Sequence, residues 1–130
     1  MFGTKIFNKQ RVKNQTAGVK GMIGTQLSFE SNEQGAVKIY FPMNVTITKI
    51  RAIAIKAIAN TDDATVQGAN STGNSTSGLL TFTASDAIAT EKSATPTTNI
   101  NVDAGSYYKL TPVKTTAGGK VQAYVEYVTR

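Results

Sequence analysis

The chain has 130 residues, a formal net charge of +6 at pH 7, and neither cysteine nor histidine. Its length is typical of a single domain with one buried core. Without Cys or His the sequence excludes disulfides, the usual zinc ligand sets, and the Ser-His and Cys-His pairs of nucleophilic catalysis.

The basic side chains are concentrated at the N-terminus. The first 20 residues carry five basic side chains and no acidic one, and the rest of the chain has nine basic and eight acidic side chains. We therefore predict an extended basic arm over residues 1–24, followed by one domain over residues 25–130. The residues expected to bind a partner through this arm are Lys5, Ile6, Phe7, Lys9, Arg11, Lys13 and Lys20.

From residue 25 onward, short runs rich in Val, Ile, Tyr, Phe and Thr are separated by turn-forming residues, as is typical of β-strands. The first of these runs alternates apolar Leu27 and Phe29 with polar residues. The next places Val37, Ile39 and Phe41 on one face. The predicted strands cover 26–30, 36–41, 45–59, a short stretch after 63, 79–84, 98–102, 106–113 and 120–128.

The longest predicted strand covers residues 45–59. Its alternation slips between Ile47 and Ile50, and we interpret the slip as a β-bulge that leaves Lys49 and Arg51 facing outward. The alanines in this stretch keep an amphipathic helix open as the alternative. The basic residues also interrupt the longest apolar-rich part of the chain, so we expect no membrane span and no membrane partner.

Polar connections separate the later strands. Residues 68–78 contain no large apolar side chain before Leu79, so we predict an exposed, mobile loop there. Residues 103–105 and 115–119 contain glycines and are predicted to be hairpin-like turns. Adjacent Asp62 and Asp63 are expected to be turn residues.

Outward-facing tyrosines are the aromatic residues that a buried core leaves unexplained. Tyr107 and Tyr108 are adjacent, so on one strand they must face opposite sides, and Tyr124 must point away from Val121 and Val125. An outward tyrosine can stack on a sugar or a base, or pack against a neighbouring subunit.

The predicted elements define an all-β protein: a single β-sandwich, jelly-roll-like, with about eight strands. The carboxylates are too few and too dispersed to form a catalytic pair or a calcium site. We therefore expect no enzyme activity, no catalytic residue, no metal and no cofactor.

The C-terminal third carries a family resemblance. Residues 101–110 (NVDAGSYYKL) followed by 117–127 (AGGKVQAYVEY) resemble the closing hairpins of jelly-roll decoration, or auxiliary capsid, proteins of tailed bacteriophages. The resemblance implies a virion protein that binds the major capsid protein on the capsid surface, as a homo-oligomer with a trimer favoured. The basic arm would then lie across the capsid or a neighbouring copy.

Two other functions remain open from the sequence. A receptor- or glycan-binding module of a tail or spike would place its specificity in residues 68–78 and in the outward tyrosines. A nucleic-acid-binding structural protein would use the basic arm against phosphates, with strongly salt-dependent binding. The body shows no stripe of basic and aromatic residues, so we do not expect nucleic acid as the partner.

Overall fold

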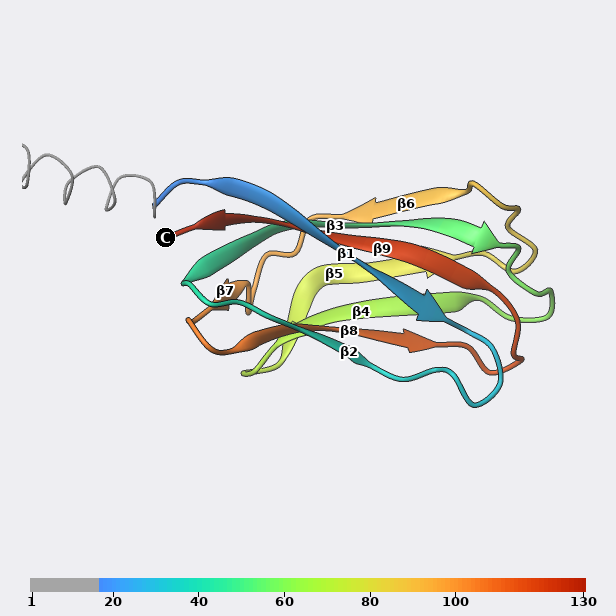
Figure 1. Cartoon of the computed structure of the whole chain (residues 1–130). Coiled ribbons are helices and arrows are strands. Elements are labelled where there is room, and N and C mark those ends of the chain that lie inside the picture. Colours follow the sequence, from blue (N-terminus) through green and yellow to red (C-terminus); the bar gives the residue numbers. More distant parts are fainter. Residues whose placement is uncertain (1–16) are drawn as a thin grey trace, which may run out of the picture.

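The structure is a computed structural model that describes residues 17–130, and these residues form an all-β sandwich of two antiparallel sheets (Figure 1). Sheet A has the strand order β1-β9-β3-β6, with short β7 also paired to β3, and sheet B has the order β2-β8-β4-β5. The predicted sandwich is confirmed. Its strands are β1 (Lys20–Ser28), β2 (Val37–Tyr40), β3 (Val45–Lys56), β4 (Ala64–Asn70), β5 (Asn74–Phe82), β6 (Glu91–Ala94), β7 (Asn101–Val102), β8 (Tyr107–Val113) and β9 (Lys120–Thr129).

The core lies between the sheets and is built from the inward positions of alternating strands. Phe29, Phe41 and Phe82 are fully buried, as the sequence predicts, and Tyr108 is the largest fully buried side chain. Burying an aromatic or large aliphatic side chain of this kind stabilises the fold by about 1.5–3 kcal/mol. The period-2 pattern therefore fixes which face of each strand points into the sandwich.

Strand β3 is confirmed with its predicted irregularity, and the alternative of a helix is wrong. The register between β3 and β9 shifts between Ile47 and Lys49, so that Ile47 and Ile50 are both buried while Lys49 and Arg51 lie on the outer face. The bulge absorbs the slip in alternation that the sequence shows. Val and Ile pack well on a pleated sheet, and here they outweigh the helical preference of the alanines.

The predicted loop over residues 68–78 is wrong. Strand β4 runs on to Asn70 and β5 starts at Asn74, so most of this polar stretch forms a paired hairpin. Its polar side chains take the place of apolar packing. The side chain of Asn70 donates to the carbonyl of Asn101 at 2.8 Å, and the hydroxyl of Ser75 donates to the carbonyl of Asn99 at 3.0 Å. Both polar side chains are buried and satisfied.

Several element boundaries also differ from the prediction. Strand β1 begins at Lys20, opposite Val128 of β9, so residues 20–24 belong to the sandwich and not to the arm. The predicted arm residues 1–16 lie outside the described residues. Strand β6 was not predicted, because its sequence EKSA lacks any apolar alternation.

The two glycine-containing connections do not form hairpins between paired strands. Residues 103–105 connect β7 of sheet A to β8 of sheet B, and residues 115–119 connect β8 back to β9. The expected positive φ angles are present, at +84° for Gly105, +137° for Gly118 and +123° for Gly119. The glycines therefore serve turns that cross between the layers of the sandwich.

Candidate interaction surfaces

Asp62 has the carboxylate that accepts the most hydrogen bonds in the described part of the chain, and its role is structural. Its carboxylate accepts a hydrogen bond from Lys114 Nζ at 2.8 Å and further bonds from the backbone amides of Thr115 and Thr116. The Lys114 ammonium, together with these amides, lowers the pKa of Asp62 to about 2. Asp63 accepts a bond from the amide of Ala84. Both aspartates hold turns in place, as predicted.

The described part of the chain contains no group of three or more acidic, His or Cys side chains that could hold a metal ion. Nor does any helix long and apolar enough to cross a membrane occur within residues 17–130. The features left to explain are the outer faces of the two sheets.

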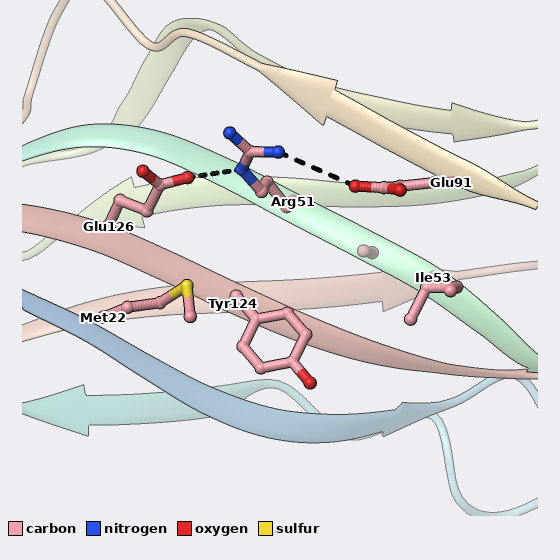
Figure 2. A pocket seen from close by; sticks show the side chains of 7 residues that line it. Met22, Arg51, Ile53, Glu91, Tyr124 and Glu126 are labelled. Carbon is pink, nitrogen blue, oxygen red and sulfur yellow. Dashed lines mark hydrogen bonds and ion pairs between the residues drawn. The ribbon is translucent and has the colours of Figure 1, made fainter.

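The outer face of sheet A contains a shallow hollow of about 450 Å³ (Figure 2). Strands β1, β9, β3 and β6 contribute its lining side chains, among them Met22, Tyr124 and Ile53. Met22 is 58% exposed. Apolar and aromatic surface is therefore presented to solvent at the centre of this face.

Charge in the hollow is balanced internally. Arg51 forms ion pairs with Glu126 of β9 and, at 3.7 Å, with Glu91 of β6, and Figure 2 shows the guanidinium between the two carboxylates. The hydrogen bond from Arg51 to Glu126 raises the pKa of the guanidinium further above its ordinary value. These residues come from three neighbouring strands, so the ion pairs cross-link sheet A on its solvent side. Such exposed pairs contribute little to stability and mainly fix the shape of the face.

Two glycines of β1 make room for tyrosines of β9. Gly24 is paired with Tyr124, and a Cβ on Gly24 would lie 2.9 Å from a ring carbon of that tyrosine. Gly21 is paired with Tyr127 on the inner face, where a Cβ would overlap the tyrosine hydroxyl. The ring of Tyr127 packs on Phe41, with centroids 5.1 Å apart. The two glycines therefore let one tyrosine lie across the solvent face and the other close the core.

The outer face of sheet B has a different character. Lys38 and Tyr40 of β2 are exposed and lie directly opposite Lys109 and Tyr107 of β8. The ammonium of Lys38 lies 4.6 Å from the centroid of the Tyr107 ring, and the rings of Tyr40 and Tyr107 meet edge to face at 5.7 Å. We call these four residues the Lys–Tyr patch.

The Lys–Tyr patch shows what sequence reasoning missed. Both lysines and Tyr107 follow the alternation of their strands, so their outward direction is readable from the sequence. Their proximity depends on the pairing of β2 with β8, which joins segments about seventy residues apart in the chain. Of the seven predicted arm residues, only Lys20 lies in the described part, exposed at the start of β1.

Comparison with known proteins supports the fold. No protein-family model matches the sequence, and no curated protein matches it significantly. A chain in the acid-stable capsid structure of Helicobacter pylori bacteriophage KHP30 aligns with a TM-score of 0.55 at 12% identity, covering 86% of this chain and 89% of the other.

Two further solved structures are similar at the same level. A chain in the capsid asymmetric unit of cyanophage Pam1 gives a TM-score of 0.52 at 12% identity, with 88% of this chain and 87% of the other covered. The Drosophila NLP core, whose structure concerns pentamer formation and histone binding, gives 0.51 at 12% identity, with 83% and 98% covered. At these identities the likeness shows a shared fold.

Proposed function

We propose that the chain is a structural protein of a phage virion, an auxiliary protein that binds the major capsid protein and decorates the capsid surface. The observation that carries this proposal is where the exposed apolar side chains lie. Of the seven large apolar side chains exposed among the described residues, five lie on strands: Met22 and Ile55 on the outer face of sheet A, and Tyr40, Leu79 and Val113 on that of sheet B. Broad sheet faces of this kind suit a large protein partner better than a small substrate.

The shared fold supports the same proposal. The chains from the KHP30 and Pam1 capsid structures align with this chain over most of their length, so a sandwich of this architecture occurs in two phage capsids. A decoration protein needs adhesive surfaces and no active site. The absence of His and Cys from the sequence is consistent with that requirement.

The N-terminal arm is the second part of the proposal. Lys5, Lys9, Arg11 and Lys13 supply positive charge, and Ile6 and Phe7 supply apolar contact, whereas Lys20 lies at the start of β1 in the sandwich. The amide of Gly18 donates to the carbonyl of Thr129 at 2.8 Å, so the chain enters the sandwich beside the end of β9. From there the arm would contact a capsid subunit or a neighbouring copy in a homo-oligomer, for which a trimer remains our expectation.

The alternative of a glycan-binding module loses one of its two supports. It placed specificity in a free loop over residues 68–78, and that segment is a paired hairpin with buried Asn70 and Ser75. Its other support, the outward tyrosines, is divided between the two faces, with Tyr124 on sheet A and Tyr40 and Tyr107 on sheet B.

The proposal is tested on purified particles. An antibody against the recombinant chain is used to probe DNA-filled heads, separated on a density gradient, from a phage whose genome encodes it. The chain is expected to sediment with the heads at a fixed ratio to the major capsid protein, and recombinant chain is expected to rebind heads stripped of it. Recovery of the chain only in tails, or only in the soluble fraction of the lysate, would contradict a decoration role.

A further inference from the structure

The strands of sheet B contain no acidic residue, and this sets the outer face of sheet B apart from that of sheet A. Strands β2, β4, β5 and β8 carry two charged side chains, Lys38 and Lys109. Strands of sheet A contain Glu91 and Glu126, both paired to Arg51. No salt bridge among the described residues includes either lysine of sheet B.

The two lysines are also directly opposite each other across β2 and β8. Like charges at opposite positions of antiparallel strands destabilise a sheet, because their Cβ atoms are only about 5 Å apart. Contact with the ring of Tyr107 stabilises the ammonium of Lys38 but leaves the positive charge in place. Flexible side chains of two lysines at opposite positions can converge on the same carboxylate.

Apolar side chains lie on the same outer face as the lysine pair. Tyr40 is 60% exposed, and Leu79 and Val113 also point outward from sheet B. Exposed tyrosines beside apolar side chains are typical of the centre of a protein–protein interface. The same face therefore offers charge for recognition and apolar area for affinity.

We propose that the outer face of sheet B is a docking site for an acidic segment of another protein, with Lys38 and Lys109 contacting its carboxylates. The site is distinct from the arm, and the assignment holds whether or not the partner is a capsid protein. Charge complementarity selects the partner: an acid-free sheet with two adjacent lysines favours a segment rich in Asp or Glu.

Single-stranded nucleic acid fits this face less well. Binding of that kind uses a groove of many cations and open aromatic faces on which bases stack. Here the described face offers two lysines, and one face of Tyr107 is covered by Lys38 while its neighbour Tyr40 meets it edge-on.

The test uses the full chain with Lys5, Lys9, Arg11 and Lys13 replaced by Ser, so that the arm does not bind the probe. Into this parent we introduce Lys38→Ser with Lys109→Ser.

The matched control is Lys20→Ser with Lys49→Ser, which removes the same charge from sheet A at one exposed and one half-buried position. The probe is a polyglutamate peptide, with binding measured by fluorescence anisotropy at low ionic strength.

We expect the sheet B variant to bind polyglutamate roughly five- to thirty-fold more weakly than the parent, and the control to stay within about twofold of it. Replacing both lysines by Arg should retain binding, because the charge is kept. Equal losses in the sheet B variant and in the control, or loss of binding in the Arg variant, would overturn the proposal.

Thermal stability and a second probe complete the test. If the lysine pair serves binding, its removal relieves repulsion, so the sheet B variant should melt at the same temperature as the parent or higher. A variant that melts clearly lower would assign the pair a structural role instead. If an oligothymidylate binds the parent more tightly than polyglutamate does, with the same dependence on Lys38 and Lys109, the partner of this face is nucleic acid and the proposal of an acidic protein segment is wrong.

Discussion

The hydroxyl of Tyr108, at the centre of the core, donates a hydrogen bond to Ser75 Oγ at 3.0 Å, and burial raises the pKa of that phenol. This contact connects the largest buried side chain to the polar hairpin of β4 and β5. The ring reaches Ser75 by passing over Gly68, where a Cβ would overlap the hydroxyl and lie 2.9 Å from Cζ.

Gly68→Ala should therefore destabilise the protein by about 1–3 kcal/mol, since Tyr108 is enclosed by the core and cannot move aside. Gly35→Ala is the matched control, because the space around Gly35 is open and its φ lies outside the left-handed region. Urea denaturation followed by circular dichroism measures both free energies of unfolding. A free energy for Gly68→Ala equal to that of the control would show that the hairpin does not pack on Tyr108.

Gly21 and Gly24 of β1 should respond differently to the same change. Gly21→Ala displaces Tyr127 from its contact with Phe41 and should cost about 1–3 kcal/mol of unfolding free energy. Gly24→Ala displaces Tyr124 on the solvent side, where the ring can rotate away, so the loss should be well below that of Gly21→Ala. The comparison uses the same denaturation assay, and equal losses would contradict the assignment of the two tyrosines to opposite faces.

Acid should weaken the fold through Asp62. The pKa of this carboxyl is lowered from 3.8 to about 2 in the folded protein, so its contribution to stability is fully present above about pH 3.8 and is lost as pH falls toward 2. Asp62→Asn should be less stable than the parent at neutral pH, because the substitution removes the carboxylate that pairs with the fully buried Lys114 side chain.

The melting temperatures of parent and Asp62→Asn, measured from pH 6 down to pH 2, should converge as pH falls through this window. Glu30, whose pKa is also lowered, chiefly by its hydrogen bond from Lys56, titrates in both proteins and cancels in the comparison. A constant difference between the two proteins across the window would show that Asp62 does not titrate in contact with Lys114.

Deleting residues 1–16 should leave the melting temperature of the isolated protein unchanged, because every described strand starts at or after Lys20. Binding to capsids should weaken strongly.

Substitutions in the arm separate charge from apolar contact. Changing Lys5, Lys9, Arg11 and Lys13 to Ser should reduce both the affinity for capsids and its salt dependence, whereas changing Ile6 and Phe7 to Ser should reduce the affinity alone. Truncated protein that still occupies every site on its capsid would refute the role of the arm.

Periodicity in the sequence was enough to predict the strands whose inner face is apolar. Val37, Ile39 and Phe41 mark one strand clearly, and the slip between Ile47 and Ile50 locates the bulge in β3. The same signal is absent where polar groups hold a strand in place. Asn70 and Ser75 are buried because they hydrogen-bond to the segment around residue 100, and such a tertiary partner cannot be read from local sequence.

The candidate surfaces were harder to predict than the fold. The outward direction of Lys38 and Lys109 follows from alternation, but their position opposite each other depends on strand pairing. Likewise, Arg51 could be placed on the solvent side of β3, yet its two acidic partners come from β6 and β9. The burial of Lys114 could not be predicted from the sequence, since its partner Asp62 has the pattern of an ordinary turn residue.

Strand β9 lies between β1 and β3 in sheet A, although it comes last of the nine described strands. During synthesis on a ribosome, β1 and β3 therefore emerge before the strand that pairs with both of them. Their apolar inner faces stay exposed until residues 120–129 have been made. Closing a sheet through contacts this distant in sequence is slow. The newly made chain should consequently depend on chaperones until β9 is released, and chains cut short before β9 should aggregate rather than fold to a smaller sandwich.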